Sequence, residues 1–152
     1  MSALSEAFAA GSILLGAEAT DWRAAIRKAG EGLVASGRAT PAYVETMVTA
    51  VETHGPYIVI APGVALAHAA ITEEVLSPGF SLARLVHPVN FGENSVALVF
   101  ALAASATASH AALMAEFSQW LTQPEQINFL LNAEGEAAIR ASLVASGAKI
   151  AE

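Results

Sequence analysis

The chain has 152 residues, of which 55% are hydrophobic and 14% charged, and its mean hydropathy is +0.52. This size predicts one domain, spanning 1–152, with a sizeable core, and the apolar composition excludes a disordered chain. The net charge of −7 and the absence of cysteine exclude general nucleic-acid binding, thiolate zinc sites and cysteine nucleophiles. The longest apolar run has nine residues, 96–104, against roughly 20 for a membrane span. The start lacks the basic segment of a secretory signal, so we expect a cytoplasmic protein.

The first predicted elements in chain order are two helices. Asp21 is a suitable N-cap for a helix over 22–36, and Gly37 stands where a helix-ending glycine belongs. Thr40, followed by proline, predicts the start of a second helix over 41–52. Apolar residues at helical spacing give this second helix a buried face, which would consist of Val44, Met47, Val48 and Val51.

Strand candidates follow the second helix. The run 57–60 is short, apolar and rich in β-branched residues, which favours a strand covered on both faces. A second apolar run covers 64–67, after a Pro-Gly turn. Two further strands are expected over 80–86 and 96–103, with a polar loop over 87–94 between them.

The rest of the chain has a helical pattern. Helices are expected from 109 to 121, after Pro124, and from 134 to 146. Helices that precede, separate and follow a few buried strands indicate an α/β layered sandwich rather than a helical bundle.

His68 is the histidine with the most suggestive position. It ends the apolar run 64–67 and is followed by small residues. A ring at the end of a buried strand is held rigidly while one nitrogen reaches solvent, which suits a nucleophile or proton carrier. The alternative is a strand-end histidine without a role.

The other three histidines have simpler explanations from local features. His110 lies at the start of a predicted helix, where free N–H groups and the helix dipole favour a bound anion, although it would serve equally as a cap. His54 lies in a last helical turn, where a cation is favoured, and His87 is expected at the surface. No two histidines have metal-ligand spacing, so no metal site is predicted.

The segment from Ala50 to His68, AVETHGPYIVIAPGVALAH, resembles the active-site region of enzyme IIA components of the phosphoenolpyruvate-dependent sugar phosphotransferase system. The resemblance is to the mannitol/fructose superfamily, and the stretches 54–57 and 61–63 are most similar to its ascorbate-type branch. The similarity extends from the helix of Trp22 to 107–110 and the helix that follows. It therefore covers most of the chain.

This resemblance implies a fold, an activity and partners. The fold would be a mixed β-sheet sandwiched between helices, in α/β/α layers, as a single domain. The protein would be a phosphotransferase in which His68 takes a phosphoryl group from the phosphocarrier protein HPr and gives it to a cognate enzyme IIB. It would work beside a membrane enzyme IIC, without a cofactor or metal. His110 would stabilise the phosphohistidine, with His54 as a neighbour, and an apolar docking rim around His68 would consist of Val64, Leu66 and Ala67.

Two other functions remain compatible with the sequence. One is a regulatory relative, in which phosphorylation of His68 is a signal and no sugar is transported. The other is a binding domain that keeps the fold and has lost phosphotransfer. Ala67, at a position where the family usually has proline, and the alanines at 69–70 keep this alternative open. The resemblance specifies no particular sugar, oligomeric state or phosphorylated imidazole nitrogen.

Overall fold

The computed structural model describes residues 3–70, 72–104 and 109–151, and the side chains of 109–110 and 146–151 lie outside the description. Five strands of the described residues form one mixed sheet in the order β1-β4-β5-β3-β2. The pairs β1–β4 and β3–β5 are parallel, whereas β4–β5 and β2–β3 are antiparallel. The strands are β1 (Ile13–Ala17), β2 (Val59–Ala61), β3 (Val64–Ala67), β4 (Gly79–Phe91) and β5 (Asn94–Ala103).

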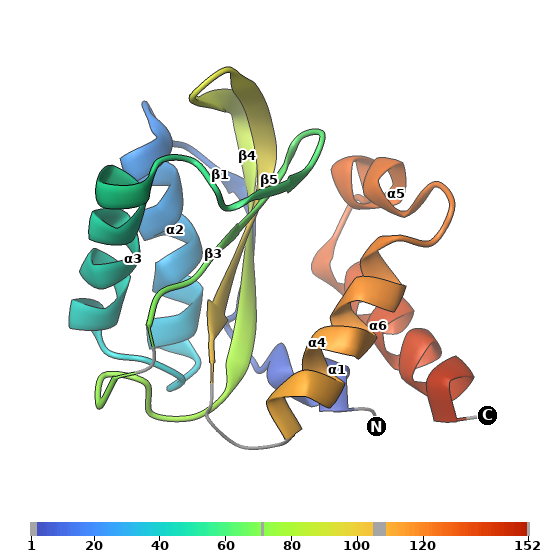
Figure 1. The fold of residues 1–152 in the computed structure, drawn as a ribbon. Helices are drawn as coiled ribbons and strands as arrows, with labels where there is room; N and C mark the ends of the chain where they lie inside the picture. The colour runs from blue at the N-terminus through green and yellow to red at the C-terminus, as the bar shows by residue number, and fades with distance from the viewer. Residues whose placement is uncertain (1–2, 71, 105–108, 152) are drawn as a thin grey trace.

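Helices cover both faces of the sheet (Figure 1). On one face lie α2 (Trp22–Ala35) and α3 (Pro41–His54). The other face carries α1 (Ala3–Ala7), α4 (Ser109–Leu121), α5 (Gln126–Asn132) and α6 (Glu136–Ala151). The expected α/β/α sandwich with a mixed sheet is therefore confirmed. None of the described helices is long and apolar enough to cross a membrane.

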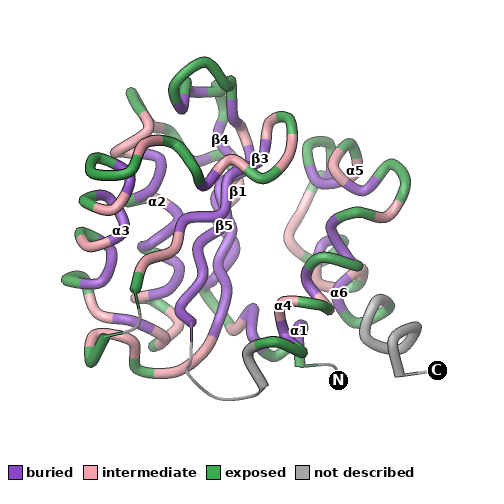
Figure 2. The backbone as a smooth tube through the Cα atoms, in the orientation of Figure 1, coloured by how far each residue is buried: buried purple, intermediate pink, exposed green. Residues whose placement is uncertain are grey.

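The sheet separates two hydrophobic cores, and Figure 2 shows its central strands almost wholly buried. The core under α2 and α3 is built mainly from aliphatic side chains, whereas the opposite core is aromatic. There the rings of Phe80 and Phe117 stack with centroids 4.5 Å apart, and Phe8 stacks on the other side of Phe80 at 5.4 Å. Both faces of β3, and of β5 from Leu98 onward, are thus sealed from water.

The ends of α2 are set by the expected residues. The Asp21 carboxylate accepts a hydrogen bond of 2.9 Å from the N–H of Ala24, as an N-cap does. At the other end Gly37 has φ +76°, and the N–H of Arg38 returns 2.8 Å to the carbonyl of Leu33. This left-handed glycine closes the helix. The buried residues expected in α3 are also confirmed, although that helix extends to His54.

Replacing Asp21 with alanine should lower the free energy of unfolding by about 1 kcal/mol, because the N–H of Ala24 loses its acceptor. Urea denaturation of the variant and the wild type measures the difference. Thr53→Ala is a suitable control, because the Thr53 hydroxyl bonds only to the carbonyl of Thr49 in its own helix. If Asp21→Ala matches Thr53→Ala in stability, the cap contributes nothing.

The expected polar loop over 87–94 is wrong. β4 continues to Phe91, and β5 begins at Asn94, so only two residues form the turn. Val89 and Phe91 are buried beside exposed polar neighbours, which gave this stretch its loop-like composition. The pairing shifts register between Arg84 and Val89, so a bulge accommodates the proline within this stretch.

The strand expected over 57–60 is also corrected. β2 covers Val59–Ala61 and lies at the edge of the sheet, so it is half exposed rather than covered on both faces. Ile58 is fully buried, but Ile60 is 45% exposed. α1 and β1 were not expected from the sequence.

The other edge of the sheet is β1, which is interrupted by Gly16. This glycine has φ +76°, and the register with β4 shifts between Leu15 and Ala17. A side chain at Gly16 would meet nothing within 4 Å, so the glycine serves the backbone conformation rather than a close contact. Neither edge of the sheet is therefore a long regular strand.

Candidate functional site

His68 follows directly after the last residue of β3. The parallel pair β3–β5 ends nearby, with Ala67 opposite Ala101 as the last partners of the ladder. Ligands of open α/β sheets bind outside the carboxyl ends of parallel strands. His68 is half-buried, and its backbone lies one residue beyond the last pair of the ladder.

The His68 imidazole is oriented by its own strand. Its Nδ1 lies 2.9 Å from the carbonyl oxygen of Leu66. A carbonyl can only accept a hydrogen bond, so this contact requires the proton on Nδ1 and leaves the lone pair on Nε2. Nε2 is then the ring nitrogen that is left without a backbone partner.

Tyr57 lies beside His68, in the segment that leads into β2. The two rings meet edge to face, with centroids 5.4 Å apart and an interplanar angle of 89°. The Tyr57 hydroxyl points to the His68 carbonyl oxygen at a long 3.5 Å. The ring of His54, at the end of α3, also lies beside Tyr57, with centroids 6.2 Å apart. The structure thus brings His54 near His68 through Tyr57, which the sequence did not single out.

Tyr43 of α3 approaches His68 from the core. Its fully buried hydroxyl donates to the carbonyl of Leu102 at 2.8 Å and accepts from the N–H of Ala69 at 3.3 Å. Burial raises the pKa of Tyr43, against the opposing effect of the N–H groups of Ala69 and Ala104. The hydroxyl therefore stays protonated at neutral pH and is able to donate.

The two remaining histidines lie in different places. The backbone of His110 belongs to the first turn of α4, the helix that follows β5, but its side chain lies outside the described residues. The serine and threonine just before it, at 105 and 107, also lie outside them. His87 is exposed in the bulge of β4, next to Val89, which pairs with the start of β5. His68 lies by the end of β5, so His87 belongs to the opposite end of the sheet.

The described basic side chains are engaged away from His68. Arg23, Arg27 and Lys28 form surface ion pairs with Glu52, Glu45 and Glu31. The guanidinium groups of Arg38, Arg84 and Arg140 bind backbone carbonyls in loops and at helix ends. None of these ion pairs and hydrogen bonds involves His68. The described residues contain no group of three His, Asp or Glu side chains that could hold a metal ion.

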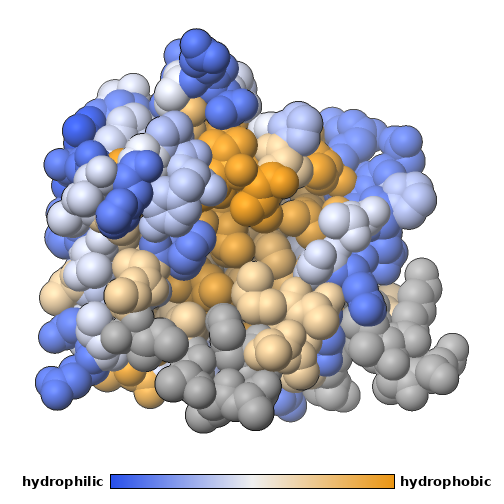
Figure 3. All heavy atoms as spheres, in the orientation of Figure 1, coloured by the Kyte–Doolittle hydropathy of each residue, from blue (hydrophilic) through white to orange (hydrophobic). Residues whose placement is uncertain are grey.

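The expected apolar rim around His68 is wrong. Val64 and Ala67 are fully buried, and Leu66 is 5% exposed, because helices cover both faces of β3. The exposed apolar surface is provided instead by Tyr57, at 46%, and Ile60. Figure 3 shows apolar residues gathered in the middle of the face that carries β2 and β3. A pocket of about 270 Å³ lies between these strands and α4–α5, lined by Ile60, Ala61, Leu66, Met114, Phe117, Ser118, Leu121, Thr122 and Ile127.

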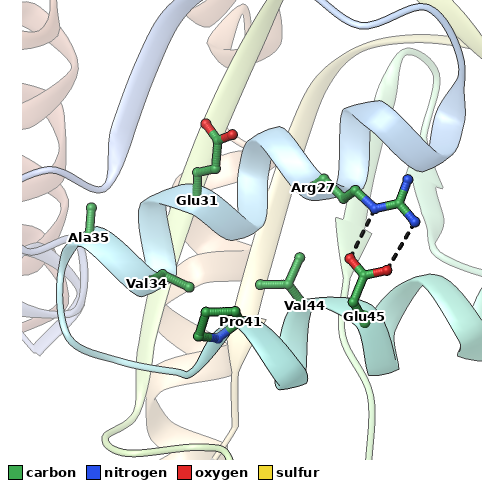
Figure 4. A pocket seen from close by; sticks show the side chains of 7 residues that line it. All are labelled: Arg27, Glu31, Val34, Ala35, Pro41, Val44 and Glu45. Carbon is green, nitrogen blue, oxygen red and sulfur yellow. Dashed lines mark hydrogen bonds and ion pairs between the residues drawn. The ribbon is translucent and has the colours of Figure 1, made fainter.

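A second pocket, of about 370 Å³, lies between α2 and α3 (Figure 4). Val34, Pro41 and Val44 form its apolar part. At its rim the guanidinium of Arg27 binds both carboxylate oxygens of Glu45 at 2.9 Å and lowers the pKa of that carboxyl. None of the residues that line this pocket belongs to the row of His54, Tyr57 and His68, so it is separate from the candidate site.

Comparison with known proteins identifies the class that this fold and site define. The family described as phosphoenolpyruvate-dependent sugar phosphotransferase system, EIIA 2, matches residues 6–145. The chain therefore belongs to this family and is a phosphotransferase that carries a phosphoryl group as an IIA component. This agrees with the family to which the sequence shows resemblance.

Individual relatives support the same family. The chain is 34% identical over 125 residues to SgcA of Escherichia coli K12, across 80% of this chain and 87% of that protein. It is 41% identical over 83 residues to the ascorbate-specific PTS system EIIA component of the same organism, across 55% and 54% of the two chains.

Solved structures extend the likeness to the whole fold. The mannitol-specific cryptic phosphotransferase enzyme IIA CmtB from Escherichia coli matches with a TM-score of 0.82 and 29% identity, over 92% of this chain and 97% of that one. A complex of enzyme IIA of the mannitol system with phosphorylated enzyme IIB, also from Escherichia coli, matches with a TM-score of 0.76 and 26% identity, over 90% and 96%. This chain is thus an IIA component of the kind that partners an enzyme IIB.

Proposed function

We propose that the protein accepts a phosphoryl group from phospho-HPr on Nε2 of His68 and transfers it to its cognate enzyme IIB during sugar uptake. The observation that carries this proposal is the contact of Nδ1 with the Leu66 carbonyl, at the carboxyl end of β3. It places the Nδ1 proton against the carbonyl, so that Nε2 is the ring nitrogen able to carry a lone pair, at the end of a paired strand. The ring of Tyr57 contacts the His68 ring, and His54 contacts Tyr57.

Each transfer is a substitution at phosphorus. The Nε2 lone pair forms a bond to phosphorus as the bond to the donor's leaving atom breaks, and the electron pair of that bond stays on the donor. The proton stays on Nδ1 throughout, donated to the Leu66 carbonyl. Transfer to enzyme IIB reverses the sequence, with His68 as the leaving group. The protein contributes mainly position and electrostatic stabilisation, as in other phosphoryl transfers.

Ascorbate is the sugar we propose, because the stretches 54–57 and 61–63 resemble the ascorbate-type branch and the chain is 41% identical over 83 residues to an ascorbate-specific relative. The chain would then act in the cytoplasm, beside a membrane enzyme IIC. The apolar surface around Tyr57 and Ile60 supports docking of partner proteins one after the other. The alternatives are an inactive relative, which would not accept the phosphoryl group, and a regulatory relative, which would accept it but not pass it to enzyme IIB. The two steps of the experiment below distinguish them.

The test is incubation of the purified protein with phosphoenolpyruvate, enzyme I and HPr, followed by mass analysis of peptides under alkaline conditions that preserve phosphohistidine. We expect one added phosphoryl group on the peptide that contains His68. Subsequent addition of the cognate enzyme IIB should remove it. No addition to a folded protein, beside an enzyme IIA that is phosphorylated in the same mixture, would contradict the proposal and favour the inactive relative.

Replacing His110 with alanine should leave phosphoryl acceptance measurable but slow it or shorten the lifetime of the phosphoprotein. The reason is that we propose His110 as a hydrogen-bond donor to the phosphoryl oxygens on His68. The rate of labelling and the rate of loss after removal of HPr are measured separately. His87→Ala is the matched control, because His87 lies exposed at the other end of the sheet. Wild-type values for both rates would remove the role proposed for His110.

A further inference from the structure

Just after His68 the backbone is held by a side chain and not by a neighbouring strand. Up to Ala67 the chain is held by its parallel pairing with β5, whose last partner there is Ala101. Beyond that pair the N–H of Ala69 and the carbonyl of Leu102 have no ladder contact with each other. The Tyr43 hydroxyl lies between them, accepting from Ala69 at 3.3 Å and donating to Leu102 at 2.8 Å.

We infer that Tyr43 is a positioning residue for phosphoryl transfer, because its hydroxyl takes the place of the next rung of the β3–β5 ladder and so fixes the backbone that directs the His68 ring. This inference rests on the proposed role of His68 as phosphoryl acceptor. Tyr43 touches neither the Nε2 atom nor a substrate in this structure. It acts through Ala69.

Two features make the Tyr43 contact a rigid one. The side chain is fully buried in the core beneath α2 and α3, so its ring cannot move without displacing packed neighbours. The hydroxyl stays protonated, because burial raises its pKa. With Leu66 holding Nδ1 on one side and Tyr43 holding Ala69 on the other, His68 is fixed in both ring and backbone.

Tyr43→Phe removes the hydroxyl and keeps the ring. The N–H of Ala69 and the carbonyl of Leu102 then lose a shared partner in a site closed to water. Small displacements of a reacting group cost up to about a hundredfold in rate. We expect the maximal rate of phosphoryl transfer to fall about tenfold in Tyr43→Phe, with the half-saturating concentration of phospho-HPr unchanged, because the docking surface is intact.

Ser81→Ala is a matched control. The Ser81 hydroxyl is also fully buried and donates to a backbone carbonyl, that of Ala29 at 2.5 Å, but it lies within β4, under α2. Both variants should lose stability, and only Tyr43→Phe should lose transfer rate. Rates are measured well below the melting temperature of each variant, so that the folded fraction is the same.

A second measurement does not depend on the variant's folding. In the wild type, hydrogen exchange should show the Ala69 amide protected to a degree similar to the Ala67 amide within β3. In Tyr43→Phe the protection at Ala69 should be lost while that at Ala67 is kept. Unprotected Ala69 in the wild type would overturn the inference even if Tyr43→Phe did not fold.

The outcomes separate this inference from the proposed function. A wild type that accepts no phosphoryl group overturns the proposed function, and the positioning role falls with it. An active wild type with an equally fast Tyr43→Phe overturns only the positioning role. Equal rate losses in Tyr43→Phe and Ser81→Ala also overturn it, because the effect would then follow from stability alone.

Discussion

Replacing His68 with alanine should reduce phosphoryl acceptance to the background of a reaction without the protein. The imidazole supplies the only nitrogen nucleophile proposed for the site, and alanine has no atom that can replace Nε2. Labelling with phosphoenolpyruvate, enzyme I and HPr, read by mass under alkaline conditions, measures the loss. Mixing with enzyme IIB should likewise give no transfer.

The same replacement should change stability little. The ring is half-buried and makes one hydrogen bond, to Leu66, with a net contribution of about 1 kcal/mol. A loss of activity with a nearly unchanged unfolding midpoint would separate chemistry from folding. His87→Ala, which removes an exposed ring at the other end of the sheet, should keep full acceptance. Label on the protein that lacks His68 would show that another residue is the acceptor.

Replacing Gly32 with alanine should be strongly destabilising, although alanine is the better helix former. Gly32 lies in the last turn of α2, pressed against the sheet and the chain that enters β1. An added Cβ would lie 2.7 Å from the Cβ of Ser81 and 3.0 Å from the carbonyl oxygen of Ser12. Neither of these atoms is the end of a flexible side chain, so α2 must move away from the sheet.

We expect this overpacking to lower the free energy of unfolding by about 2 kcal/mol, after the gain in helix propensity is included. In a chain of this size that corresponds to a fall in melting temperature of roughly 4–8 °C. Gly135→Ala is the control, because a Cβ at Gly135 would meet nothing within 4 Å. Both substitutions restrict the unfolded chain equally, so their difference reports the contact. Similar melting temperatures would mean that α2 shifts at little cost.

Local signals in the sequence predicted α2 and α3 well. The N-cap Asp21 and the helix-ending Gly37 act within a few residues of their own position, so their roles can be inferred without a tertiary structure. The hairpin of β4 and β5 could not be inferred in this way. Its exposed tip has the composition of a loop, and only pairing across the hairpin shows that Val89 and Phe91 belong to a strand.

The candidate site also contains residues that the sequence could predict and residues that it could not. His68 could be singled out because it ends an apolar run and lies in a recognisable segment. The roles of Tyr43 and Tyr57 could not, because their contacts join distant parts of the chain. Tyr43 is 59 residues from Leu102 and 26 from Ala69. The residues of β3 that were expected to form a docking rim are buried, because a strand between two helical layers exposes its ends rather than its side chains.

The two irregular edges of the sheet affect the concentration that such a carrier can reach without aggregating. An exposed regular strand is a template on which a second chain can add its own strand, which is a common start of aggregation. Here one edge is broken by Gly16 and the other is three residues long. The rate at which a carrier delivers phosphoryl groups rises with its concentration. At high concentration these edges allow copies of the chain to collide without pairing strand to strand.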